Sequence, residues 1–257
     1  MKFSALSAVC AATVCGGGAS WAQPTQADGR WRGLAGASVS ATSGNSSSSN
    51  VQLNLDMARQ TDTDKLTTGA LVDYGRSEVD GVRSTTSNKW SLNGQYDYNL
   101  SERLYVFGKL GLQGDRVIDL SLRRTLGTGL GYKVIKEADT TFDLFAGVAD
   151  TRSRYRSVQL IDGVQGTRFS NTSVLLGEES THKLSDTVFF KQRVEMYPPI
   201  SGFGGTLVKG TANLGVALNA KMSLNVGLAN EYNSAPAAGR KKNDLSLLTG
   251  LSVKLGE

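Results

Sequence analysis

The chain has 257 residues, with 28 lysine and arginine residues against 23 acidic ones, so its formal net charge is +5. This mild excess is scattered along the chain, which argues against nucleic acid as a partner. Both cysteines, Cys10 and Cys15, lie in the first 22 residues, so the predicted mature chain can form neither disulfides nor thiolate metal sites.

The first 22 residues have the pattern of a cleavable signal peptide for the Sec pathway. Lys2 precedes a short apolar core, and Ser20-Trp21-Ala22 forms a small-x-small cleavage site. A buried N-terminal helix and a lipoprotein signal at Cys15 are the alternatives. We therefore expect residues 1–22 to be a signal peptide, 23–30 a short polar lead-in and 31–257 a single domain. No apolar stretch reaches the roughly 18 residues of a membrane helix.

A two-residue alternation of apolar and polar side chains then recurs along the chain. It is clear in Val51–Met57, Trp90–Tyr98, Met222–Leu228 and Leu245–Val253. Because successive side chains of a strand point to opposite faces, each segment has one apolar and one polar face. In an exported chain this pattern predicts an all-β fold, a transmembrane antiparallel up-and-down β-barrel integral to an outer membrane.

We expect about 12 strands, with 10 as the alternative count. Their predicted ranges are Trp31–Ala41, Asn50–Arg59, Leu66–Gly75, Asn88–Asn99, Arg103–Gln113, Ser121–Tyr132, Thr141–Asp150, Phe169–Thr181, Thr187–Tyr197, Thr206–Leu218, Met222–Tyr232 and Asp244–Leu255. The connections alternate between short and long, the longest being Arg76–Ser87 and Thr151–Arg168. This asymmetry predicts short periplasmic turns and longer extracellular loops, whereas a soluble secreted β protein, the alternative architecture, has no reason to show it.

Charged residues within the strands should face the lumen, because an ionised group at the bilayer centre costs roughly 2–4 kcal/mol. The residues that alternate with these charged ones along each strand, such as Val51, Leu53 and Leu55, should then face lipid. The six acids and five bases expected to line the lumen favour mutual pairing over a selectivity ring of one sign. They are Asp56, Asp73, Asp97, Lys109, Arg123, Asp143, Lys191, Arg193, Glu195, Lys209 and Glu231.

Two further groups of basic residues fall in predicted loops. The plain interpretation is solvated loop charge, and the alternative is contact with anionic lipid or solute, since guanidinium groups bind phosphates with paired donors. The expected partners are outer-membrane lipids and lipopolysaccharide, together with periplasmic chaperones and the barrel-assembly machinery during insertion. The basic residues are Arg152, Arg154, Arg156 and Arg168 in one loop, and Arg240, Lys241 and Lys242 in the other.

Three motifs resemble catalytic or binding signatures without the context these need. Gly127-Thr128-Gly129-Leu130-Gly131 lacks the following helix of a dinucleotide site, so a smooth inner wall of a strand explains it better. Ser180-Thr181-His182-Lys183 has the Ser-x-x-Lys spacing and the only histidine, but it ends a strand. Asp62-Thr63-Asp64 supplies too few ligands for calcium. We expect no catalytic residue, cofactor or metal.

The order of several motifs resembles a known family. Trp31-x-Gly33 opens the first strand, Tyr96-x-Tyr98-x-Leu100 meets Arg103-Leu104-Tyr105-Val106-Phe107, and Gly129-x-Gly131-Tyr132 follows. With Gly44-Asn45 and Asp115-Arg116, they resemble the salt-induced outer membrane proteins, catalogued as domain of unknown function 481. The resemblance covers Trp31 to Leu255 and implies an outer-membrane barrel of a Gram-negative bacterium, linked to osmotic or salt stress. It brings no catalytic residues.

Three functions fit these sequence features. The first is a non-enzymatic barrel serving envelope integrity, with a lumen filled by paired charges. The second is a porin-like diffusion channel for small solutes, because twelve strands enclose a wider interior than eight. In that case Thr151–Arg168 could fold inward and place its arginines as a filter for small anions. The third and most distant is an outer-membrane hydrolase that depends on His182.

Overall fold

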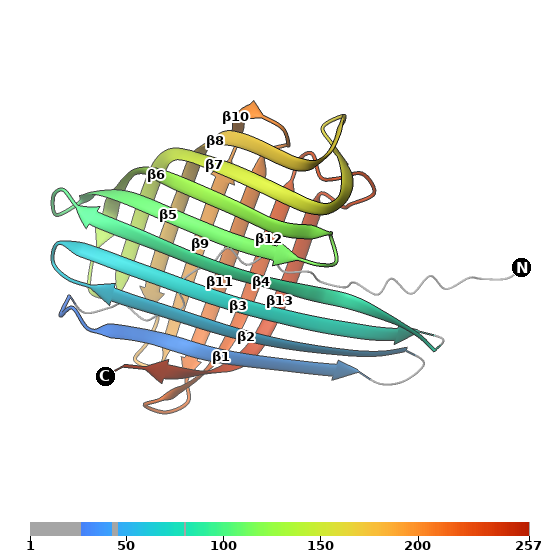
Figure 1. Cartoon of the computed structure of the whole chain (residues 1–257). Helices are drawn as coiled ribbons and strands as arrows, with labels where there is room; N and C mark the ends of the chain where they lie inside the picture. The colour runs from blue at the N-terminus through green and yellow to red at the C-terminus, as the bar shows by residue number, and fades with distance from the viewer. Residues whose placement is uncertain (1–26, 43–45, 80, 257) are drawn as a thin grey trace, which may run out of the picture.

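The alternating segments form long strands that close into an antiparallel β-barrel in a computed structural model, which describes residues 27–42, 46–79 and 81–256 (Figure 1). The strands in these residues are β1 (Trp31–Thr42), β2 (Ser46–Gln60), β3 (Asp64–Val79), β4 (Val82–Asn99), β5 (Leu104–Asp115), β6 (Leu120–Lys136), β7 (Thr140–Ile161), β8 (Val164–Lys183), β9 (Val188–Tyr197), β10 (Pro199–Gly202), β11 (Leu207–Ala217), β12 (Met222–Asn233) and β13 (Asn243–Leu255). None of the described residues belongs to a helix long and apolar enough to cross a membrane. The predicted signal peptide lies outside the described residues and stays a prediction.

Closure of the barrel follows from pairing between sequence neighbours. Each long strand pairs with the next, β13 pairs back to β1, and β8 pairs with β9. All twelve predicted strands are therefore confirmed. The thirteenth, β10, lies in the predicted loop Pro198–Gly205, where the chain bends at the two prolines and continues beside β8. Figure 1 shows β10 as a short strand at the edge of the barrel.

The outer face of the barrel carries large apolar side chains. Leu53, Leu92 and Leu130 are each about half exposed, at 54, 49 and 51%. Aromatic side chains border this apolar belt at both ends. Trp31, Tyr96, Tyr98 and Tyr132 lie near the short-turn end, and Tyr74, Trp90 and Tyr232 lie near the other. Apolar rows between two aromatic girdles are typical of barrels that contact lipid.

Two predicted long loops are wrong, because both are mostly strand. The segment Arg76–Ser87 continues the β3–β4 hairpin, and Thr151–Arg168 continues the β7–β8 hairpin. The β7–β8 hairpin turns at Asp162 and Gly163, whose φ angles are 52° and 75°. Two successive positive φ angles match a tight type I′ turn, which Asp-Gly favours. The two ends of the barrel still differ. At the end where long loops were predicted, the strands extend beyond the apolar belt.

Aromatic rings on the inner face lie across glycines of the neighbouring strands. Tyr105 on β5 faces Gly131 on β6, and Phe145 on β7 faces Gly177 on β8. A Cβ atom at either glycine would overlap the facing ring, so only glycine leaves room for it. The rings of Phe107 and Phe145 meet edge to face, with centroids 5.7 Å apart. Bulky side chains thus fill the interior on the side of β5 to β9.

Candidate functional site

The structure places the eleven charged residues predicted for the lumen on the inner face. Asp97, Lys109, Arg123, Asp143, Arg193, Glu195 and Lys209 line an internal cavity of about 110 Å³. Asp56, Asp73 and Lys191 are buried on the same face, and Glu231 approaches Lys209 with an N–O distance of 3.9 Å. Within each strand, alternation explains the placement; Lys109, for example, shares the parity of the buried Phe107 on β5.

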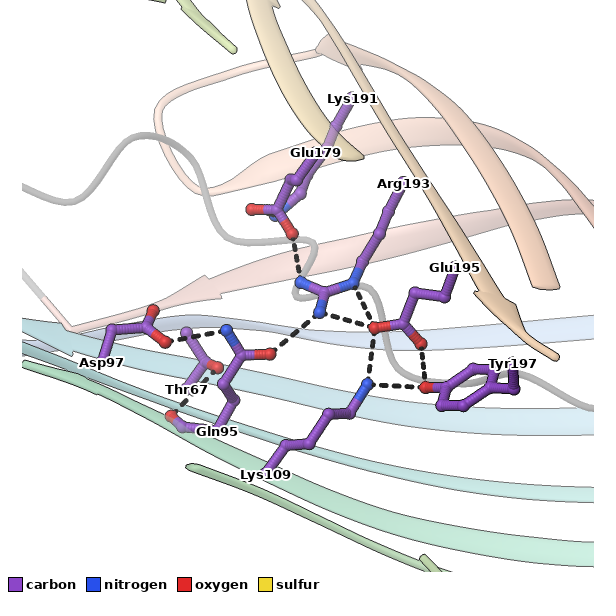
Figure 2. A network of polar contacts seen from close by, with 9 residues as sticks. All are labelled: Thr67, Gln95, Asp97, Lys109, Glu179, Lys191, Arg193, Glu195 and Tyr197. Atoms are coloured by element: carbon purple, nitrogen blue, oxygen red, sulfur yellow. Dashed lines mark hydrogen bonds and ion pairs between the residues drawn. The ribbon is translucent and has the colours of Figure 1, made fainter. Parts of the chain in front are cut away.

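Four successive inward residues of β9 form the centre of a polar network (Figure 2). They are Lys191, Arg193, Glu195 and Tyr197, and each is separated from the next by one outward residue. Arg193 donates to Glu179 on β8 at 2.7 Å and to Glu195 at 2.7 Å. Lys191 approaches the other carboxylate oxygen of Glu179 at 3.1 Å. The guanidinium also lies over the Phe145 ring, 4.8 Å from its centroid.

This network crosses the lumen. Arg193 Nη2 donates to Gln95 Oε1 on β4 at 2.9 Å. Lys109 Nζ on β5 donates to Glu195 Oε1 at 2.5 Å and to the Tyr197 hydroxyl at 2.9 Å. Three strands separate β5 from β9 around the wall, so these contacts span the interior. Figure 2 shows Gln95 and Lys109 reaching from one wall toward Arg193, Glu195 and Tyr197 on the other. We call these five side chains the cross-lumen bridge.

Charge in and around the bridge is balanced. Lys65 on β3 interacts electrostatically with Glu179, Asp97 and Asp143, which come from three other strands. The central group then contains four bases and four acids. The bases are Lys65, Lys109, Lys191 and Arg193, and the acids are Asp97, Asp143, Glu179 and Glu195. Because opposite charges lie next to each other, each desolvated ion has a partner.

Sequence reasoning missed several inward charges. Lys89 forms a buried pair with Asp73 at 3.7 Å, and both side chains are almost inaccessible, at 4 and 3%. Glu179 and Lys65 belong to the network just described. Parity could have found Lys89 and Glu179, since Lys89 has opposite parity to Trp90 and Glu179 shares the parity of the buried Leu175. They were not predicted, because Lys89 lies at the start of its predicted strand and Glu179 lies in a segment that alternates only weakly.

The rest of the inner wall is also closely packed. Ser223, Ser246, Asn213 and Gln52 come from β12, β13, β11 and β2, and their exposures are 0, 2, 5 and 6%. Side chains that line a wide aqueous passage would be accessible to water. Asp56 on β2 interacts electrostatically with Lys191 on β9, on the other side of the barrel. The inner faces of opposite walls therefore approach each other, and the remaining cavity has room for only several water molecules.

The connections at the outer end also meet above the lumen. Ala238 in the β12–β13 connection donates its N–H to the Leu160 carbonyl of the β7–β8 hairpin at 3.2 Å. Arg240 Nη2 donates to the Val117 carbonyl of the β5–β6 connection at 3.0 Å. Below them Leu120, Tyr155, Ile161 and Phe169 form an apolar cluster with Ile118 and Ala237. These contacts join connections from different sides of the barrel.

The predicted basic loop residues lie elsewhere than expected. Arg152, Arg154, Arg156 and Arg168 belong to strands and are exposed on the outer face, while Tyr155, between two of them, and Phe169, next to Arg168, are buried on the inner face. The idea of an inward-folding arginine filter is therefore wrong, because the alternation that turns the aromatic residues inward turns the arginines outward. In the second group, Arg240 makes the contact just described, and Lys241 and Lys242 are exposed.

The motifs with catalytic spacing do not assemble a site. The buried Ser180 Oγ has no hydrogen-bond partner among the described residues. The His182 ring stacks against Phe190 at 6.2 Å, and Lys183 pairs with Asp186 at 2.8 Å. Gly127, Gly129 and Gly131 lie within β6, where Lys109, Gly147 and Tyr105 approach them. Within the described ranges, no three His, Cys, Asp or Glu side chains are placed to hold a metal ion.

Comparison with known proteins identifies the family. The family model described as "Protein of unknown function, DUF481" matches residues 35–255. The chain belongs to this family. The resemblance seen in the sequence motifs is thus confirmed, while the link to salt stress stays a prediction. No curated protein matches the chain.

Several solved structures of outer-membrane proteins have a similar fold. The NanC porin in its rhombohedral crystal form has 11% identity and a TM-score of 0.48, with 88% of this chain and 97% of that chain covered. The COG4313 outer membrane channel from Pseudomonas putida F1 has 13% identity and a TM-score of 0.47, with 89 and 96% covered. The translocator domain of the autotransporter NalP from Neisseria meningitidis has 11% identity and a TM-score of 0.44, with 88 and 86% covered. At this identity the likeness concerns the fold alone.

Proposed function

We propose that the protein is an integral outer-membrane barrel with a structural, non-enzymatic role in the envelope, and that its lumen is closed to solutes. Insertion is supported by the outer face, where apolar side chains such as Leu53 and Leu130 are half exposed between two aromatic girdles. In water this face would be costly, because each fully exposed side chain of this size loses about 1.5–3 kcal/mol relative to burial. A lipid bilayer removes that cost.

The observation that carries the closed lumen is the cross-lumen bridge. Lys109 on β5 reaches across the interior to the Glu195 carboxylate on β9, which also pairs with Arg193 on its own strand, and the Glu195 side chain is 8% exposed. Opening a passage here would separate ion pairs that are largely shielded from water, which costs several kcal/mol for each uncompensated ion. The contact between the outer connections at Leu160 and Ala238 narrows the same path at its outer end.

A diffusion channel is the second candidate, and the internal cavity favours it. The cavity of about 110 Å³ is lined by residues of β3 to β9 and β11, the bridge among them, and charged groups of both signs line it. A shift of the Lys109 and Arg193 side chains would extend this space along the barrel axis. Such a channel would pass small polar solutes with little preference for the sign of their charge, because the lining is balanced.

Recording from purified protein in planar bilayers separates the two candidates. We expect no conductance steps from the wild-type protein, and steps from Lys109→Ala/Arg193→Ala, which removes both long side chains of the bridge. Steps from the wild type would overturn the closed lumen and favour the channel.

Insertion itself has a separate test. Heat-modifiable migration on a gel and extraction from membranes only by detergent are expected, and both should hold for the double variant as well. Free solubility without detergent would disprove the membrane barrel. An envelope role predicts that cells lacking the protein become permeable to detergents and bile salts, and that the conductance-silent wild type restores the barrier.

A further inference from the structure

Four arginines gather on the outer face of β6, β7 and β8. Arg124 on β6 lies directly opposite Arg152 on β7, and Arg154 on β7 lies directly opposite Arg168 on β8. All four are exposed. The two pairs are adjacent, since Arg152 and Arg154 are two residues apart on one strand. We call these four residues the outer basic patch.

The positive charges of the outer basic patch repel one another, so the patch does not stabilise the fold. Directly opposite like charges on neighbouring strands destabilise a sheet, because their Cβ atoms are about 4.5–5.5 Å apart. Asp150 accepts a hydrogen bond from Arg152 at 3.0 Å. Arg124, Arg154 and Arg168 have no ion-pair partner among the described residues, so the patch with Asp150 keeps a charge of +3. An anion with several acceptor oxygens would relieve this repulsion.

The backbone that carries the patch is held in place from the inside. Tyr155 and Phe169, the inward neighbours of Arg154 and Arg168, are buried and meet edge to face with centroids 6.0 Å apart. They pack with Leu120 at the start of β6. The three strands therefore present the arginines from a fixed surface, which reduces the conformational entropy lost when an anion binds.

A shallow apolar groove continues from the patch along the belt. It has a volume of about 630 Å³ and runs over β3 to β8, with Leu110, Leu126 and Val148 among its walls. Its lining includes Gly94 and Gly108, whose missing side chains deepen the surface. Asp150 and Thr172 also line the groove. Asp150 is two residues before Arg152, so the apolar groove and the outer basic patch are continuous.

We propose that this surface binds a phosphorylated acyl lipid of the outer leaflet. The phosphate would lie on the outer basic patch, where guanidinium groups can donate paired hydrogen bonds, and an acyl chain would lie in the groove below it. The order of the two features along the strands matches the order of headgroup and chain in a membrane. Charge complementarity favours a phosphate over a neutral headgroup, and the continuous groove favours a lipid over free phosphate. The inference depends on the proposed insertion into the membrane.

The headgroup contact can be tested with diphosphorylated lipid A and native mass spectrometry of the detergent-solubilised full-length protein. We expect Arg124→Gln/Arg154→Gln to weaken binding about tenfold, since it removes one guanidinium from each opposed pair. The matched control Lys241→Gln/Lys242→Gln removes the same charge from the same end of the barrel and should bind like the wild type. Equal loss in both variants would show general electrostatic attraction and would overturn a defined site.

The acyl contact has its own variant. A Cβ atom at Gly108 would meet nothing within 4 Å, so Gly108→Leu should fold normally and occupy the groove. We expect it to weaken binding of lipid A several-fold while the arginines remain intact. Removing the phosphates from the lipid should weaken binding to the wild type as much as the arginine changes do. Competition by inorganic phosphate at millimolar concentration, together with unchanged binding in Gly108→Leu, would show a free-anion site and contradict the lipid.

These outcomes are distinct from failure of the proposed function. If every variant inserts into vesicles and migrates as a heat-modifiable barrel but the arginine variant binds lipid A like the wild type, the lipid site is wrong and the membrane barrel stands. If the wild type does not insert, both proposals fail together.

Discussion

The closed lumen predicts that Glu195 is the most sensitive charge in the protein. Its Oε1 accepts hydrogen bonds from Lys109 at 2.5 Å and from Arg193 at 2.7 Å, and its Oε2 accepts one from Tyr197 at 2.7 Å. The substitution Glu195→Gln keeps the shape but leaves the central group with one excess positive charge. Breaking a buried pair typically costs 3–5 kcal/mol, so we expect a loss of about 3 kcal/mol, at the low end because the cavity admits water.

Urea unfolding of the refolded barrel in detergent, followed by tryptophan fluorescence, measures this change. Glu78→Gln serves as control, since Glu78 pairs with Arg83 at 2.7 Å on the exposed β3–β4 hairpin, and we expect no measurable change there. The double variant Lys109→Met/Glu195→Gln restores charge balance and should recover more than half of the loss. A loss below about 1 kcal/mol for Glu195→Gln, similar to an ordinary surface substitution, would refute the argument that the bridge is shielded from water.

Three further changes test other parts of the structure. Gly131→Val should lower the free energy of unfolding by about 1–3 kcal/mol because its side chain would overlap Tyr105, whereas Gly108→Ala should have no effect in the same urea assay. Gly163→Ala should cost about 1 kcal/mol because Gly163 has a φ of 75°, and faster proteolysis at the hairpin tip would report it. His182→Ala should leave any lipid hydrolysis in a purified preparation unchanged, because its ring stacks on Phe190 and forms no hydrogen bond with a serine among the described residues. A loss of hydrolysis would revive the enzyme hypothesis.

The strands could be predicted because alternation is a local property, but their ends could not be placed by the same rule. Beyond the apolar belt both faces meet water, so the alternation fades while the hydrogen-bonded ladder continues. The signal that was available is Asp-Gly between apolar residues, in Val79-Asp80-Gly81-Val82 and Ile161-Asp162-Gly163-Val164. This dipeptide strongly favours a two-residue hairpin turn. With this signal, both segments would have been predicted as strands joined by a tight turn.

The sequence predicted which residues lie on the inner face, but not which of them contact each other. Parity placed Lys109 and Glu195 on the same side of the wall, yet they are 86 residues apart in sequence. Which inward residues meet depends on the number of strands, on their register and on how far opposite walls approach. None of these is a local property of the sequence. The cross-lumen bridge therefore required the structure.

The two faces of the barrel divide the charge of the chain unequally, and this supports both proposals. The inner-face residues named above comprise seven acids and seven bases, once Glu179 joins the six predicted acids and Lys65 and Lys89 join the five predicted bases. A balanced interior gives no ion of either sign a reason to enter, which suits a closed lumen better than a selective pore. The outer basic patch has no such balance, so the surface where an unpaired charge could recruit a partner is the outer one, which under the proposed insertion would lie among lipid headgroups. An anion would therefore be stabilised on the outer face of the barrel and not in the lumen.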